Sequence, residues 1–181
     1  MNDQGNPVLY AIVTGSSVAR DVGKLVDLAQ ADGWDVYVIA SPDGLRFIDA
    51  EALAVKTGHG IRSQYRDPGA PDALPPAEAM VVAPLTCNSA AKWAAGISDT
   101  LPLGLLVEAV GLRLPVVAVP FSSREHLEFP AVQNALRKLA EWGVTMLAAD
   151  DIPQPSESHL FPWRLAWHAL LDHPRLSVVD G

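Results

Sequence analysis

Residues 8–17 read VLYAIVTGSS, and this stretch decides the fold class. The apolar run 8–13 is short, continuous and rich in strand-forming residues, which is typical of a strand covered on both faces. Apolar residues then recur at helical spacing from Val18 to Ala29, and Gly33 ends that pattern. A second apolar run follows at 35–40. Strand, loop, helix and strand therefore succeed one another as at the start of a doubly wound parallel sheet.

The rest of the chain continues this alternation. Further strands are expected at 61–63, 79–83, 115–119 and 144–147, and helices at 50–57, 86–97, 103–110, 130–142 and 161–171. The segment 66–76 is dense in Pro, Asp, Gly and Ala, which predicts a surface loop. We expect a three-layer α/β/α sandwich with a Rossmann-like parallel sheet. One domain would span 1–181, with a C-terminal helical extension over 160–172.

The composition excludes several classes of function. The chain has 181 residues, of which 49% are hydrophobic, and a formal net charge of −8 without a local basic patch. Such a protein is a poor candidate for binding nucleic acid or an anionic membrane. Cys87 is the sole cysteine, which excludes an internal disulfide and a multi-thiolate metal site. With no apolar run long enough to span a membrane and a polar N-terminus, a cytoplasmic location is expected.

Polar residues follow the first strand, at the edge where a parallel sheet binds its ligands. The segment TGSS at 14–17 lies between a strand and a helix start, where backbone N–H groups lack partners and the helix dipole adds positive charge. Gly15 would let a phosphate approach the backbone, and Ser16 and Ser17 would add hydroxyl donors. An ordinary helix cap explains the same residues. The complete dinucleotide fingerprint and the P-loop lysine are both missing.

A second polar segment, PLTCNS at 84–89, follows the strand 79–83 and opens the next helix. Its side chains would line the same crevice as those of residues 14–17. Asn88 can both donate and accept hydrogen bonds, which suits the edge of a flavin or a substrate amide. Helix capping by Thr86 or Asn88 is the alternative interpretation. Cys87 is expected to be an inert, small apolar residue, since nothing nearby in the sequence favours its thiolate.

Three motifs follow one another between about residue 9 and residue 147. TGSSVA at 14–19 is similar to a T-G-S-I-A phosphate loop. PLTCNS with AKWAAGISDTL at 91–101 resembles a P-A-S/T-A-N-T segment that leads into a helix ending in G-x-A/S-D-N-L. FPAVQNALRKL at 129–139 with WGV at 142–144 resembles H-P-x-x-Q-x-N-L-x-x-L-x-x-x-G-V. These patterns together resemble the flavin-containing cysteine decarboxylase superfamily. It includes phosphopantothenoylcysteine decarboxylase, peptidyl-cysteine decarboxylases and, more distantly, flavin prenyltransferase.

The resemblance implies an FMN site shared between subunits, in a trimer or a multiple of trimers. It implies a phosphate held by the loop after the first strand and an isoalloxazine ring bordered by the segment after the 79–83 strand. The implied cofactor-binding residues are Gly15, Ser16, Ser17, Ser41, Pro84, Thr86 and Asn88. The apolar stretch 102–110 and the tryptophans of the C-terminal helix, Trp163 and Trp167, suggest surface that another subunit covers.

Two residues that carry the reaction in the resembled family are absent. The family's histidine base would fall near 67–73, which here reads DPGAPDA, and its P-x-M-N-x-x-M-W motif aligns with PFSSREHL at 120–127, where Ser123 replaces the Asn. Arg124 could bind a carboxylate or phosphate, as in the R-E-T-P stretch of flavin prenyltransferase, or form a solvated surface pair. His126, and less so His59, are the candidate acid–base groups.

Two classes of function remain open. The first is a divergent FMN-dependent enzyme related to the cysteine decarboxylases, acting on a small molecule or a cysteine-containing peptide, with His126 and Arg124 as catalytic candidates. The second is a flavin-binding protein without this catalysis, such as a regulatory subunit; a flavin prenyltransferase-like enzyme is a further alternative. The missing His and Asn favour the second class or a changed reaction. No metal is expected in either case.

Overall fold

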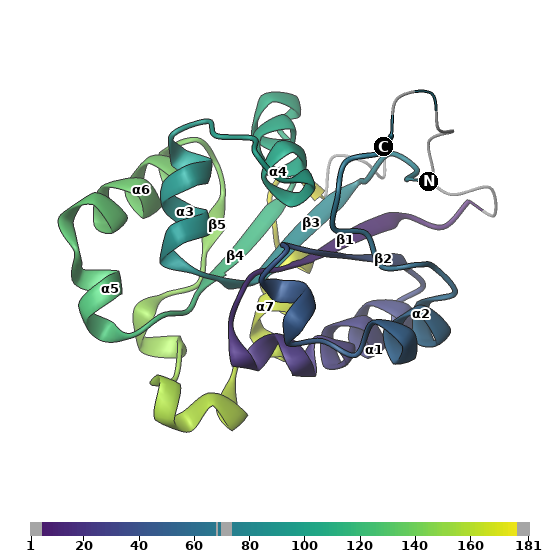
Figure 1. Cartoon of the computed structure of the whole chain (residues 1–181), viewed down its shortest axis with the longest axis horizontal. Helices are drawn as coiled ribbons and strands as arrows, with labels where there is room; N and C mark the ends of the chain where they lie inside the picture. Colours follow the sequence, from purple (N-terminus) through teal and green to yellow (C-terminus); the bar gives the residue numbers. More distant parts are fainter. Residues whose placement is uncertain (1–4, 68, 70–73, 177–181) are drawn as a thin grey trace.

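A parallel sheet forms the centre of the computed structural model, which describes residues 5–67, 69 and 74–176 (Figure 1). The strand order is β2-β1-β3-β4-β5, and every pair is parallel. The strands span Val8–Val13 (β1), Asp35–Ala40 (β2), Ala79–Leu85 (β3), Val116–Pro120 (β4) and Thr145–Met146 (β5). Every residue of β1, β3 and β4 is buried, because helices cover both faces.

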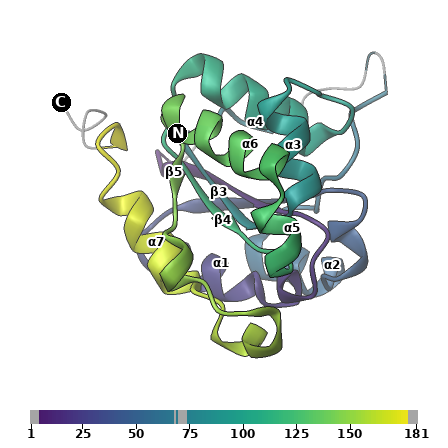
Figure 2. The same cartoon turned by 90° about the vertical axis from the view of Figure 1, so that its left-hand side faces the viewer.

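Helices form a layer on each side of the sheet (Figure 2). On one side lie α3 (Cys87–Ala94), α4 (Leu101–Leu112) and α6 (Pro130–Glu141). On the other lie α1 (Gly23–Ala31) and α7 (Trp163–Leu171), and α2 (Ala50–Thr57) packs beside α1 and β2. The short helix α5 spans Arg124–Glu128, and 3-10 turns span Ser17–Asp21 (η1), Gly44–Arg46 (η2), Ala149–Asp151 (η3) and Pro155–Leu160 (η4). The predicted three-layer α/β/α sandwich is confirmed.

Several element boundaries differ from the sequence prediction. The expected strand at 61–63 is a single bridge between Arg62 and Ile39, beside the edge strand β2. The helix expected to end at residue 97 stops at Ala94, before Gly96 at φ +71°. The next helix begins at Leu101 instead of 103, because a proline fits the first helical turn. Residues 68 and 70–73 of the predicted surface loop lie outside the described residues.

Within the described residues, no helix is long and apolar enough to cross a membrane.

The tryptophans of α7 are not exposed, so the expectation that another subunit covers them is wrong. Trp163 and Trp167 are 4% and 1% exposed, and both belong to the core on the α1 side of the sheet. The indole N–H of Trp167 donates to Asp32 Oδ2 at 2.6 Å, and its ring meets Trp34 edge to face. The C-terminal helix is therefore part of the folded domain.

The bond between Asp32 and Trp167 makes a testable contribution to stability. In Asp32→Ala the buried indole N–H loses its acceptor, so we expect the free energy of unfolding to fall by about 1–3 kcal/mol. Asp32→Asn keeps an acceptor oxygen and should lose less. Asp172→Ala, at an exposed position that ends α7, serves as the control and should change little. Urea unfolding measures all three; equal losses in Asp32→Ala and Asp172→Ala would contradict the assignment.

Candidate functional site

The side chain of Thr14 ties the end of β1 to the end of β3. Thr14 is 2% exposed, and its hydroxyl donates to the carbonyl of Pro84 at 2.9 Å. The same oxygen accepts the backbone N–H of Thr86 at 2.9 Å. The backbone N–H of Thr14 also donates to Pro84, at 3.2 Å. Because β1 and β3 are parallel neighbours, these bonds hold the two polar segments found in the sequence side by side.

The loop that follows Thr14 presents free backbone donors. Among the described residues, no acceptor is found for the backbone N–H groups of Gly15 and Ser17, whereas Ser16 N–H donates to Thr14 at 2.7 Å. The chain then enters η1 rather than the α-helix expected directly after residue 17, and α1 begins only at Gly23. Free N–H groups at the start of a helical segment are suited to an anion such as a phosphate.

The turn after β2 packs closely over this loop. A Cβ placed on Gly15 would lie 2.7 Å from the Asp43 Cβ, so only glycine fits here. The Ser41 hydroxyl accepts the N–H of Gly44 at 2.9 Å and so shapes this turn; Ser41 does not line the crevice described below. The Asp43 carboxylate is exposed and lies 3.8 Å from the Arg46 guanidinium, which offsets its charge beside the loop.

A crevice of about 320 Å³ opens at this edge of the sheet. The loops after β1, β3 and β4 contribute most of its lining, which consists of Gly15, Ser16, Ser17, Thr86, Cys87, Phe121, Ser122, Ser123, His126 and Pro155. Of the residues singled out from the sequence, the crevice gathers the loop glycine and serines, Thr86 and His126. Pro84 lies below it as the acceptor for Thr14, and Asn88 is exposed on the first turn of α3 without lining it.

Ser122 is a crevice residue that sequence reasoning did not single out. Its hydroxyl accepts the backbone N–H of Cys87 at 3.1 Å, which links the start of α3 to the loop after β4. Its position directly after the 115–119 strand was the available signal, since polar residues at that edge meet there. Cys87, interpreted from sequence as inert packing, is only partly buried and lines the crevice.

His126 and Arg124 face different spaces. His126 lines the crevice, and its Nδ1 lies 2.8 Å from the Ser123 hydroxyl. Arg124 instead donates through Nε to Glu128 at 2.7 Å, and this bond raises the pKa of Arg124. Arg124 and Glu128 line an adjoining cavity of about 470 Å³. The cavity and the crevice share the lining residues Phe121, Ser122 and Pro155, so they lie next to each other.

His59 lies near the amino-terminal end of β2, at the end of the sheet opposite the crevice. Its Nε2 is 2.6 Å from Asp35, the first residue of β2, and its ring stacks on Tyr37 with centroids 3.8 Å apart. The crevice forms at the carboxyl ends of the strands, whereas Asp35 begins its strand. His59 is thus not brought together with the other candidate residues.

Comparison with known proteins identifies the family of this chain. A family model described as Flavoprotein matches residues 1–162. The coenzyme A biosynthesis bifunctional protein CoaBC of Thermococcus kodakarensis is 25% identical over 148 residues, which cover 79% of this chain and 36% of that protein. The chain thus spans about a third of the length of this curated relative.

Two solved structures share the fold. The FMN-dependent cysteine decarboxylase TvaF from thioviridamide biosynthesis superposes with a TM-score of 0.74 at 21% identity, over 96% of this chain and 99% of that one. The epidermin biosynthesis protein EpiD from Staphylococcus aureus gives a TM-score of 0.68 at 25% identity, over 78% of this chain and 82% of that one. The resemblance to the flavin-containing cysteine decarboxylases is confirmed, and with it a flavin cofactor. The chain belongs to the Flavoprotein family.

Proposed function

We propose that the protein binds FMN in the crevice between the loops after β1, β3 and β4, as a divergent relative of the cysteine decarboxylases. The proposal rests on the hydrogen bonds that the Thr14 hydroxyl makes to Pro84 and Thr86. They set the backbone N–H groups of Gly15 and Ser17, which have no acceptor among the described residues, beside Thr86. A phosphate needs several donors without a competing negative charge nearby. The loop provides backbone and hydroxyl donors, and the carboxylate of Asp43, which packs against Gly15, has Arg46 as a partner.

The residues divide into two groups around the proposed cofactor. Gly15, Ser16 and Ser17 would hold the phosphate through backbone and hydroxyl donors, and Thr86 would border the ring. Pro84 and Asn88 would complete the ring's surroundings, although neither lines the crevice and Asn88 is exposed on α3. Ser41 would act through the turn that it shapes with Gly44 rather than by touching the phosphate.

The FMN supplies an electron acceptor for oxidising a thiol-bearing carbon when it is bound. Among the crevice-lining residues, Cys87 and His126 carry the thiol and the imidazole, the side chains suited to nucleophilic or acid–base chemistry. Because Ser123 occupies the Nδ1 side of His126, its Nε2 is the nitrogen left to take a proton from a substrate. Arg124 would have to leave Glu128 to hold a substrate carboxylate. We therefore propose a changed or slow reaction rather than efficient oxidative decarboxylation.

A second candidate is a flavin-binding protein without this catalysis, such as a regulatory subunit. The pairing of Arg124 with Glu128 favours it, because the pair points into the adjoining cavity and leaves the crevice without a cationic carboxylate anchor among its lining residues. A flavin prenyltransferase-like activity remains a further alternative. It would use Arg124 to contact a phosphate, and it also requires the ion pair to open.

Flavin binding is tested by a matched pair of glycine variants. Wild-type protein should bind FMN with micromolar or better affinity, and riboflavin, which lacks the phosphate, about tenfold more weakly or worse. Gly15→Ala should weaken FMN binding by about tenfold or more, because its methyl group meets Asp43 and displaces the loop. Gly60→Ala, where a Cβ meets open space, should bind normally.

Calorimetry and flavin fluorescence measure these affinities, and circular dichroism shows whether the variants are folded. A colourless wild-type protein that takes up no flavin would overturn the proposal. Equal affinity for FMN and riboflavin would show that the loop after β1 does not hold a phosphate.

The activity prediction concerns cysteine-ended substrates. FMN-loaded protein should turn over phosphopantothenoylcysteine and short cysteine-ended peptides far more slowly than about once per second. A missing positioned acid–base group alone costs roughly a hundred- to ten-thousandfold in rate. Mass spectrometry detects loss of the carboxyl group. Turnover near one per second would contradict the prediction, and His126→Asn and Arg124→Ala would then show which residue had taken over.

We also propose a homo-oligomer, a trimer or a multiple of trimers. The helix α4 is apolar apart from Glu108, and an apolar groove of about 270 Å³ lies between α3, α4 and the end of α6. Trp142, which lines this groove, is 44% exposed. Burial of such an apolar surface against another copy of the chain would be favourable.

Light scattering should give a mass of three chains of 19.3 kDa, or a multiple of that mass. Trp142→Glu should lower the mass, whereas Val55→Glu, at an 81% exposed position on α2, should leave it unchanged. A monomer mass for wild-type protein at every concentration tested would refute the oligomer.

A further inference from the structure

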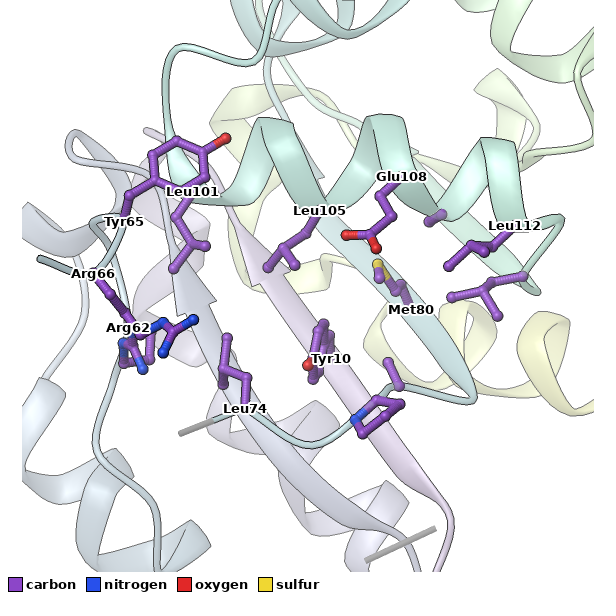
Figure 3. A pocket seen from close by; sticks show the side chains of 14 residues that line it. Tyr10, Arg62, Tyr65, Arg66, Leu74, Met80, Leu101, Leu105, Glu108 and Leu112 are labelled. Atoms are coloured by element: carbon purple, nitrogen blue, oxygen red, sulfur yellow. The ribbon is translucent and has the colours of Figure 1, made fainter. Parts of the chain in front are cut away.

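A second hollow lies away from the crevice, on the face of the sheet that α4 covers. It has a volume of about 360 Å³ and shares no residue with the crevice or with its adjoining cavity. β1 and β3 form its floor, α4 forms one wall, and the described segments 62–66 and 74–77 form the other (Figure 3). Its size falls within the range of small-molecule sites in proteins.

The middle of this pocket is apolar. Tyr10 and Met80 rise from the sheet and are 4% and 3% exposed, and Leu101 and Leu105 extend from α4 toward them. The Tyr10 hydroxyl donates to the carbonyl of Pro75, which anchors the second wall to the floor. An apolar body with a few polar groups at defined points is the usual build of a ligand pocket.

One end of the pocket holds the guanidinium of Arg62, for which the described residues supply no partner. Arg62 is partly buried, and its backbone is fixed beside β2, donating to Val38 at 3.4 Å and accepting from Ala40 at 2.9 Å. In the described part of the chain its side chain makes no hydrogen bond or ion pair. Arg66 lies next to it (Figure 3). A partly buried cation with no counter-charge favours an anion, and a planar guanidinium suits a carboxylate.

The other end carries a single negative charge. Glu108 projects from α4 over Met80, and Leu105 and Tyr10 lie between it and the arginines (Figure 3). Its carboxylate also has no hydrogen bond or ion pair among the residues described. A ligand that is anionic along its whole length would be repelled by Glu108. A ligand with a protonated amine there would gain an ion pair.

We propose that this pocket binds a small zwitterion with an apolar body. Its carboxylate is held by Arg62, its apolar part lies against Tyr10 and Leu105, and its ammonium group meets Glu108. The class comprises aminocarboxylic acids whose charged groups stand at opposite ends of a short aromatic or aliphatic body. The proposal does not depend on flavin binding, because the two hollows have no residue in common.

The test uses 4-(aminomethyl)benzoate as the probe and two fragments of it as comparison ligands. Benzoate lacks the amine, and benzylamine lacks the carboxylate. FMN is added to saturation first, so that an aromatic probe cannot occupy the crevice, and the flavin absorbance is followed throughout. We expect the complete probe to bind with a dissociation constant of about a millimolar or lower, and each fragment about tenfold more weakly, without a change in the flavin spectrum.

Charge-specific variants assign each end of the probe to one residue. Arg62→Met should weaken the probe and benzoate by about ten- to a hundredfold and leave benzylamine unchanged, since a charge-assisted hydrogen bond contributes that much. Arg62→Lys keeps the charge and should retain part of the affinity. Glu108→Gln should weaken the probe and benzylamine but not benzoate. Arg137→Met, at an exposed position on α6, is the matched control and should bind like wild type.

Ligand-observed NMR titration gives the affinities, and light scattering on the same samples gives the mass. The crossed pattern, in which each variant affects only the fragment with the matching charge, would establish the site. Absence of saturable binding, or binding that neither Arg62→Met nor Glu108→Gln changes, would overturn the proposal. A change of mass in Arg62→Met without any probe binding to wild type would show instead that another copy of the chain fills the pocket.

Discussion

The candidate site depends on the buried hydroxyl of Thr14. It donates to the carbonyl of Pro84 and accepts from the backbone N–H of Thr86, and so satisfies two backbone groups at the end of β3. No apolar residue could make both bonds, because the oxygen has to act as donor and acceptor at once. With the two strand ends held together, the loop after β1 and the start of α3 face a common crevice. The geometry of the proposed flavin site therefore depends on a residue that need not touch the flavin.

The apolar runs were reliable guides to the sheet. β1, β3 and β4 lie within a residue or two of the predicted ranges, because a strand buried on both faces has to be apolar throughout. Contacts between distant turns could not be predicted in the same way. Asp43 packs over Gly15, and Trp167 donates a hydrogen bond to Asp32 across a separation of 135 residues, only because the fold places these segments together. No local pattern carries that information.

The same limit explains why the arrangement of the candidate catalytic residues could not be predicted from the sequence. His126 and Arg124 are two positions apart in the sequence, yet α5 directs one toward the crevice and the other toward the adjoining cavity. Both were catalytic candidates from the sequence, but side chains two residues apart on a helix do not share a face. Ser122 shows the converse case: it joins the crevice because β4 ends beside β3, and the hydrogen bond from Cys87 fixes its place.

The crevice and the pocket under α4 differ in the kind of charge that could attract an anion. The chain carries a net charge of −8, so its general field opposes anions, and each anion site needs a local source of attraction. In the crevice that source is the set of backbone N–H groups at Gly15 and Ser17, since Arg46 and Arg124 already have carboxylate partners. In the pocket under α4 it is the guanidinium of Arg62. Oriented backbone dipoles suit a phosphate that must approach the main chain closely, whereas a side-chain cation suits a carboxylate whose partner ammonium lies across an apolar gap. A ligand chosen for one hollow is therefore poorly matched to the other, although both are formed by the same sheet.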